Sequence, residues 1–351
     1  MSALARSVDQ VIGTLSRFLH VRPARLNTVD DLGPYLGASS SVLFPPPRVP
    51  PVTVVRSPVR RWHSCSGAPV IEALEWRSEH VPLCPRYQSR HEGEYASNQR
   101  VVARWMHPAS GPRRRALVYV HGWLEPGPWV EQTVLLPRLY DALGVDVLHV
   151  QLPFHGSRNP KGSLFHGEFF WTADLVRSFE AVRQSCIDSR TLVAWLRDRG
   201  YTEVGVTGIS MGGSIAMLLA CLEPQTPDYV VPIVGHLQLA DAVEHAPIFW
   251  RMKRDLEGFR IDRARREEIF GQLGLAGLAP VVPPERQLWI MARDDMFVTA
   301  PLVERQWRDW GRPPIVWIPG GHMTFPLSLG RIVESMRDFH ATLPEPQSYV
   351  S

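Results

Sequence analysis

Ser210 stands at the centre of the segment Gly208-Ile209-Ser210-Met211-Gly212-Gly213, which contains a Gly-x-Ser-x-Gly motif. The short β-branched run 203–207 precedes the motif, and an apolar helical pattern over 214–222 follows it. Between a strand and a helix, this motif forms a turn so tight that the serine backbone is strained and its hydroxyl stands above the strand end. Glycine at 208 and 212 removes the side chains that would clash there. The segment therefore predicts that Ser210 is a catalytic nucleophile.

A serine hydroxyl is a poor nucleophile at neutral pH and needs a base within hydrogen-bonding distance. His322 is the best candidate, because it follows the last apolar strand and the pair Gly320-Gly321, which lets the loop bring the ring back over the sheet. A carboxylate must then hold the imidazole in the right tautomer. The pair Asp294-Asp295 follows the preceding strand. We predict Asp295 as this acid and Asp294 as a turn or capping residue.

Acyl chemistry of this kind also needs hydrogen-bond donors for the negative charge that develops on the carbonyl oxygen. The amide of Met211, directly after the serine, is the first predicted donor. The second is predicted at Trp123, because His121-Gly122 turns the backbone after an apolar strand. Leu124 lies next to it and is a predicted pocket residue.

The segment that follows the next strand, Pro153-Phe154-His155-Gly156-Ser157, is expected to shape the rim of the site. Phe154 and His155 are therefore predicted to line the substrate pocket. A dense aromatic group comes just afterwards and consists of Phe165, Phe169, Phe170 and Trp171. As one face of a helix these rings are expected in the core, and any ring that faces the pocket would imply an apolar acyl or alcohol group.

Composition excludes several classes of function. The charged fraction is 21% and the formal net charge is +3, with no basic stripe interleaved with aromatic residues, so no nucleic-acid partner is expected. Four cysteines without metal-ligand spacing and 13 histidines without a His-Glu-x-x-His motif predict no metal and no cofactor. The few cysteines and the absence of a secretory signal favour a cytoplasmic protein. No apolar run is long enough to predict a transmembrane segment.

Short apolar strands alternate with helical patterns from about residue 70 onward. The predicted strands are 70–76, 100–106, 116–120, 145–150, 204–207, 229–234, 287–292 and 315–318. The predicted helices between them are 131–143, 179–199, 214–222, 302–310 and 331–340. This alternation predicts an α/β fold with a mostly parallel sheet that is covered by helices on both faces.

Three segments fall outside the alternation. Residues 1–69 are predicted to hold an amphipathic helix over the first 25 residues and a proline-rich extended strap at 44–51. We expect the helix to dock on the main domain, 70–343, without exposing a large apolar stripe, and the alternative is a helix that contacts a membrane surface or a partner. Residues 241–284 predict a small helical lid over the strand ends, or else a long helical crossover. Residues 344–351 form a tail.

Together these residues resemble the α/β-hydrolase superfamily over roughly 70–340. The matching features are Gly200-Tyr201, the block from Thr207 to Gly213, Asp294-Asp295 and Gly320-Gly321-His322. They look like the family known as alpha/beta hydrolase domain-containing protein 18, while dienelactone-hydrolase-like and acyl-esterase relatives share the Gly-Gly ending of the elbow.

The resemblance implies an eight-stranded sheet and a serine hydrolase with a Ser-Asp-His triad in that chain order. In such hydrolases a small apolar residue follows the acid by three positions. Asp295 has Val298 there, whereas Asp294 has Phe297. If neither carboxylate serves, Asp241 is the remaining candidate.

These observations predict a carboxylic-ester hydrolase that acts on a small-molecule or lipid ester. An acyltransferase, a thioesterase and a peptidase would use the same residues, and a non-catalytic binding module would keep the elbow only for its shape.

Overall fold

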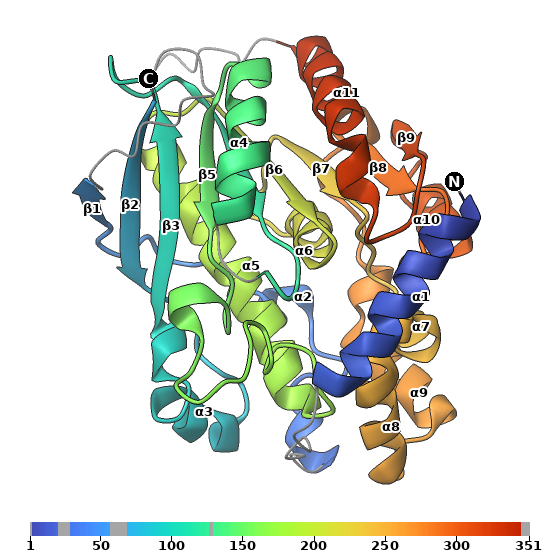
Figure 1. The fold of residues 1–351 in the computed structure, drawn as a ribbon. Helices are drawn as coiled ribbons and strands as arrows, with labels where there is room; N and C mark the ends of the chain where they lie inside the picture. Colours follow the sequence, from blue (N-terminus) through green and yellow to red (C-terminus); the bar gives the residue numbers. More distant parts are fainter. Residues whose placement is uncertain (1, 20–28, 57–68, 126–128, 345–351) are drawn as a thin grey trace.

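The structure is a computed structural model that describes residues 2–19, 29–56, 69–125 and 129–344. The predicted tail beyond residue 344 and Cys65 lie outside these residues. The strands of the described chain form one mixed sheet with the order β1-β2-β3-β5-β4-β6-β7-β8-β9 (Figure 1). The first four strands in this order pair antiparallel, and every later neighbouring pair is parallel. The prediction of a mostly parallel sheet with helices on both faces is confirmed.

The described strands are β1 (Thr53–Arg56), β2 (Val70–Arg77), β3 (Arg100–His107), β4 (Arg115–Val120), β5 (Asp146–Val150), β6 (Glu203–Ile209), β7 (Tyr229–Ile233), β8 (Trp289–Ala292) and β9 (Ile315–Ile318). The described α-helices are α1 (Ser2–Leu19), α2 (Ser40–Leu43), α3 (Pro85–Glu92), α4 (Trp129–Leu143), α5 (Leu175–Asp198), α6 (Met211–Leu219), α7 (Leu239–His245), α8 (Trp250–Gly258), α9 (Arg263–Leu273), α10 (Ala300–Asp309) and α11 (Leu329–Thr342).

The expected number of eight strands was one too few among the described residues. All eight predicted strands are present, and the ninth, β1, follows the predicted strap 44–51 in the region 1–69, where no strand was predicted. β1 begins just after Pro50-Pro51, contains no proline, and pairs only with β2. An edge position tolerates the flanking prolines, because a strand there needs hydrogen-bond donors on one side only.

The apolar core has one layer on each face of the sheet. Leu139 of α4 and Met336 of α11 are buried in the layer on one face, whereas Leu192 of α5 and Leu218 of α6 are buried in the other layer. Figure 1 shows α4 and α11 in front of the sheet and α5 behind it. Since both faces are covered, the central strands β5 and β6 are buried along their whole length.

Two buried arginines of α5 bind the chain where α2 ends and the proline-rich strap begins. Arg183 donates from Nε to the carbonyl oxygen of Leu43 at 2.6 Å, and Arg190 donates from Nη1 to those of Phe44 and Pro45 at 2.7 and 3.0 Å. A proline-rich segment cannot form a regular ladder, so its buried carbonyl groups need donors from elsewhere. The guanidinium groups supply them.

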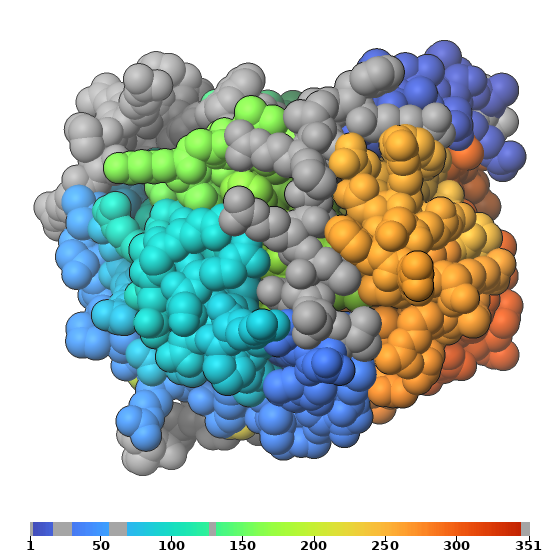
Figure 2. Space-filling view, turned by 90° about the horizontal axis from the view of Figure 1, so that it is seen from below, coloured from blue at the N-terminus to red at the C-terminus, as the bar shows by residue number. Residues whose placement is uncertain are grey.

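Helix α1 packs against the lid segment, which we define as residues 241–284. A Cβ added to Gly13 would lie 2.3 Å from Cβ of Pro247, so the backbone of α1 directly contacts the start of the segment. Helices α7 to α9 account for most of its described residues. Figures 1 and 2 both show α1, in dark blue, beside the orange lid helices.

The expectation that α1 would expose no apolar stripe was wrong. Leu4, Val11 and Leu15 are 70%, 56% and 56% exposed. The helix instead buries the face that carries Ala5, Asp9 and Ser16. Within this face, Gly13 packs on the lid segment, and Asp9 bonds to the backbone of Met296 and His322 outside it.

Candidate active site

Ser210 lies at the junction of β6 and α6 with a positive φ. Its φ and ψ are 55° and −115°, a conformation that is costly for a residue with a side chain. Its amide donates to the carbonyl oxygen of Ile233 at 2.8 Å, which fixes the turn to the neighbouring strand. A Cβ added to Gly208 would lie 2.4 Å from the carbonyl carbon of Gly212. The strained serine and the need for glycine at 208 agree with the geometry expected from the motif.

Three side chains from separate loops form a chain of hydrogen bonds. His322 Nε2 lies 2.8 Å from Ser210 Oγ, and His322 Nδ1 lies 2.7 Å from Asp295 Oδ2. His322 follows β9 and Asp295 follows β8, so the ends of parallel strands bring them together with the serine after β6. Asp295 and His322 are each only 6% exposed.

The second oxygen of Asp295 is also held. Asp295 Oδ1 accepts hydrogen bonds from the amides of Phe297 and Val298, both at 2.7 Å. These bonds leave Oδ2 directed at the histidine, so that Nδ1–H donates to the carboxylate and Nε2 is free to accept the serine proton. The arrangement suits a histidine that takes a proton from Ser210.

The pKa of His322 is raised above its ordinary value of 6.5 by its charged neighbours. Burial of the ring lowers the pKa, but the charge of Asp295, its hydrogen bond, and the charge of Asp9 together raise it by more. The site therefore stabilises an imidazolium cation, the form that His322 takes after it has accepted a proton.

The other two candidate acids lie elsewhere. Asp294 donates its amide to the carbonyl oxygen of Gly320 at 2.9 Å, and its Oδ1 accepts from Arg6 at 3.3 Å. Asp241 forms an ion pair with Arg305 at 3.5 Å. Of the three carboxylates, Asp295 is therefore the one that the structure brings to His322.

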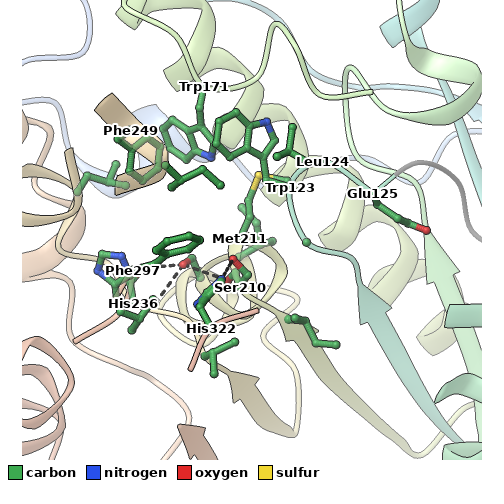
Figure 3. A pocket seen from close by; sticks show the side chains of 18 of the residues that line it. Trp123, Leu124, Glu125, Trp171, Ser210, Met211, His236, Phe249, Phe297 and His322 are labelled. Carbon is green, nitrogen blue, oxygen red and sulfur yellow. Dashed lines mark hydrogen bonds between the residues drawn. The ribbon is translucent and has the colours of Figure 1, made fainter. Parts of the chain in front are cut away.

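An apolar cavity of about 320 Å³ opens beside Ser210 (Figure 3). Aromatic rings from three segments meet on its wall: Phe249 of the lid segment stacks on Trp123 with centroids 5.8 Å apart, and Trp171 meets Phe249 edge-on at 6.0 Å. Met211, Leu124 and His322 also line the cavity. A cavity with this lining favours an apolar group next to the serine hydroxyl.

Only some of the residues predicted for the pocket and the oxyanion hole line this cavity. Met211, Trp123 and Leu124 line the cavity with Ser210. The prediction that Phe154 and His155 line it was wrong, because both side chains are 1% exposed and are turned into the core. Phe154 packs edge-on against Tyr95, and His155 lies between the rings of His121 and Phe170.

The aromatic group 165–171 also differs from the expectation. The segment is a series of turns and not a helix, and Phe170 is in the core as expected. Trp171, by contrast, lines the cavity. One member of the group therefore faces the pocket, which was the alternative that implied an apolar substrate group.

Sequence reasoning missed several residues of the site. Ile12 of α1, Phe249 and His236 line the cavity, and Asp9 bonds to the loop of His322. Burial lowers the pKa of His236 to about 4, so this histidine is neutral near pH 7. Its Nδ1 accepts from the amide of Gln238 at 3.1 Å, which assigns its proton to Nε2. No motif marks these positions, since they come from segments far from the elbow in sequence.

Two negative findings apply to the described residues. No group of three or more His, Cys, Asp or Glu side chains there is arranged to hold a metal ion. None of the described helices combines the length and the apolar character needed to cross a bilayer.

Comparisons with known proteins give both a sequence match and a fold match. The model of the family described as "Alpha/beta hydrolase domain containing 18" matches residues 96–246. An uncharacterized protein of Mycobacterium tuberculosis, found in strains CDC 1551 / Oshkosh and ATCC 25618 / H37Rv, is 31% identical over 255 residues. That match covers 67% of this chain and 57% of the relative, so the chain spans less than two thirds of the relative's length.

The solved structure of acetyl xylan esterase 1 from Thermoanaerobacterium sp. JW/SL YS485 aligns with this chain at a TM-score of 0.54. The alignment covers 92% of this chain and 98% of the esterase, with 15% sequence identity. At that identity the likeness concerns the fold alone.

Proposed function

This chain belongs to the α/β-hydrolase superfamily, and from that premise we propose that it is a serine hydrolase that cleaves a carboxylic ester. The observation that carries the proposal is the hydrogen-bond chain from Asp295 through His322 to Ser210, at the wall of an apolar cavity. The strained backbone of Ser210 supports it as well, because such strain is concentrated at functional sites.

In the proposed first step, Ser210 Oγ attacks the carbonyl carbon of the ester while His322 Nε2 takes the serine proton. Asp295 holds the ring and stabilises the imidazolium. The tetrahedral intermediate then expels the alcohol, which receives the proton from His322, and the acyl group stays on Ser210. In the second step, water gives a proton to His322 and attacks the carbonyl carbon of the acyl-enzyme. The bond from that carbon to Ser210 Oγ then breaks, His322 returns the proton to Oγ, and the carboxylic acid leaves.

Two amides are proposed to bind the negative oxygen of each intermediate. The amide of Met211 lies in the first turn of α6, where an N–H has no acceptor within its own helix. The amide of Trp123 is the proposed second donor, on the loop after β4. Removing one such donor typically costs about 3–4 kcal/mol of transition-state stabilisation.

The proposed substrate is a small-molecule or lipid ester with an apolar acyl group. The aromatic wall of Trp123, Trp171 and Phe249 supports this choice, since it offers apolar surface beside the nucleophile. Each methylene buried in the cavity contributes about 0.8 kcal/mol, or roughly fourfold in kcat/KM. On a series of 4-nitrophenyl esters, kcat/KM should rise with acyl length until the cavity is filled, and then fall.

Covalent labelling tests the nucleophile. A fluorophosphonate should modify wild-type protein at Ser210, as located by peptide mass spectrometry, and should not modify Ser210→Ala. Ser214→Ala is the matched control, because Ser214 lines the same cavity four residues later and should not be needed for labelling. Absence of labelling in the wild type, or undiminished labelling of Ser210→Ala, would overturn the proposal. Product analysis with an added alcohol would then separate hydrolysis from acyl transfer.

A further inference from the structure

Asp9 is a fully buried carboxylate on the amino-terminal helix that bonds to the active-site loops. It is 0% exposed. Its Oδ2 accepts from the amide of His322 at 2.8 Å and from that of Met296 at 3.1 Å, and its Oδ1 accepts from the amide of Met323 at 2.8 Å. A carboxylate that accepts three backbone hydrogen bonds is held firmly in place.

These three amides belong to two different loops. His322 and Met323 lie on the loop after β9, which carries the proposed base, and Met296 follows the proposed acid directly on the loop after β8. Asp9 is thus a single side chain that joins the two loops. Arg6 lies about one turn before Asp9 on the same helix and forms a more exposed ion pair with Asp294, on the loop after β8, at 3.3 Å.

The loop of His322 approaches Asp9 so closely that it needs glycine. A Cβ added to Gly321 would lie 2.5 Å from Asp9 Oδ2. Helix α1 makes further contacts near the site. Gly13 packs on Pro247, and Ile12 lines the cavity. The close fit places the carboxylate directly under the backbone of the histidine loop.

We propose that Asp9 is a positioning residue of the reaction, which holds the loop of His322 against the loop of Asp295 and so keeps the histidine ring aligned with Ser210. This inference rests on the proposed function. Asp9 touches neither the serine nor the substrate cavity in this role, and it acts through the backbone of His322. The amino-terminal helix thereby becomes part of the active site.

The charge of Asp9 has a second effect on His322. Together with Asp295, it raises the pKa of the imidazole. The nearby His236 has a pKa of about 4 and so carries no charge near pH 7. Removing the charge of Asp9 should therefore lower the pKa of His322. This shift reports that a charged carboxylate lies beside His322, and the positioning role itself is tested by the effect on kcat relative to KM.

The test compares Asp9→Asn and Asp9→Ala with the control Ser16→Ala. Ser16 is a buried polar residue on the same helix, and its hydroxyl donates to the carbonyl oxygen of Gly13 within α1 at 2.6 Å. Activity is measured on a 4-nitrophenyl ester, and active sites are counted by phosphonate titration. In Asp9→Ala, kcat should fall roughly 10- to 100-fold while KM stays within about twofold of the wild-type value. Small misplacements of reacting groups have effects of this size. Asp9→Asn keeps one acceptor oxygen, so its kcat should lie between those of Asp9→Ala and the wild type. The kcat of Ser16→Ala should match that of the wild type.

An NMR titration of the His322 ring, assigned with His322→Gln, gives a readout that does not depend on turnover. The pKa of His322 should be lower in Asp9→Asn than in the wild type and in Ser16→Ala. An unchanged kcat together with an unchanged pKa of His322 in Asp9→Asn would overturn the inference. A loss of activity that is explained entirely by fewer active sites reacting with the phosphonate would also overturn it. If Asp9→Ala does not fold, Asp9→Asn decides. If the wild type takes no phosphonate, the proposed function fails, and the titration still shows whether the charge of Asp9 acts on His322.

Discussion

The carbonyl oxygen of Val120 lies so close to Gly212 that a Cβ added at position 212 would stand 1.9 Å from it. Val120 ends β4, and Gly212 is the second residue of α6. The helix behind the nucleophile therefore packs directly on the backbone that leads to Trp123. This contact sets the separation of the two segments that supply the proposed oxyanion amides.

Gly212→Ala should for this reason abolish phosphonate labelling and lower stability. The neighbour is backbone and cannot swing away, so α6 must shift, and overpacking of this kind typically costs about 1–3 kcal/mol. Gly271→Ala is the control, because Gly271 lies in α9 with no atom within 4 Å of an added Cβ. It should gain about 0.5–1 kcal/mol. Thermal melts and labelling rates of both variants check this, and normal labelling of Gly212→Ala would contradict it.

Asp295→Asn should lower kcat by about 10⁴-fold while the fold persists, through the wrong histidine tautomer. An asparagine held by the amides of Phe297 and Val298 would direct its NH2 group at His322 Nδ1. Nδ1 would then have to accept a hydrogen bond instead of donating one, which leaves the proton on Nε2. Asp294→Asn should cost less than about tenfold, because that carboxylate pairs with an exposed Arg6. Steady-state kinetics on one activated ester compares them. The opposite order of the two losses would reassign the acid.

The acidic limb of the pH profile should follow His322. The proposed reaction needs this histidine neutral, and its charged neighbours raise its pKa above 6.5. Activity should therefore fall on acidification with an apparent pKa above 6.5 in kcat/KM. His236→Gln should leave the midpoint of the limb in place, since the pKa of His236 is lowered to about 4 and it does not titrate in this range. A midpoint below 6.5 would contradict the assignment of the base.

The elbow and its partners were predictable because each carries a local signature. Gly208 and Gly212 are required by contacts within one strand-turn-helix unit, so the motif contains its own structural reason. Asp295 was distinguished from Asp294 by Val298, and the amide of that residue does bond to the carboxylate. Such features depend on neighbours within a few residues, which a sequence displays directly.

Contacts between distant segments could not be predicted in the same way. Asp9 precedes His322 by 313 residues. Nothing in the sequence of an amphipathic helix indicates that its acidic residue will accept hydrogen bonds from two distant loops. Phe154 and His155 failed for a related reason. The segment 163–171 folds over them and brings Gly167 within reach of both His155 and Trp123, which leaves only Trp123 at the cavity. Which residues line a pocket depends on which of several neighbouring loops covers the others.

Helix α1 presents an unusual combination of a buried polar face and an exposed apolar one. Leu4, Val11 and Leu15 recur at the spacing of one helical face and are all more than half exposed. Arg6 is also exposed, with 63% of its side chain accessible. The sequence-based alternative of a helix that contacts a membrane surface therefore stays a prediction, and it is now compatible with a docked helix, since docking uses the opposite face.

We expect the protein to co-sediment with vesicles that contain phosphatidylserine, and the substitution of Leu4, Val11 and Leu15 together by glutamine to weaken this binding. Apolar side chains beside a basic residue insert at the boundary between headgroups and acyl chains, and the interaction grows with buried apolar area. Glutamine is a good helix former, so the melting temperature should stay near that of the wild type. Val81→Gln removes an equally exposed apolar residue outside α1 and should leave binding unchanged. Equal binding of the triple variant and the wild type would rule out the apolar face of α1 as the membrane contact.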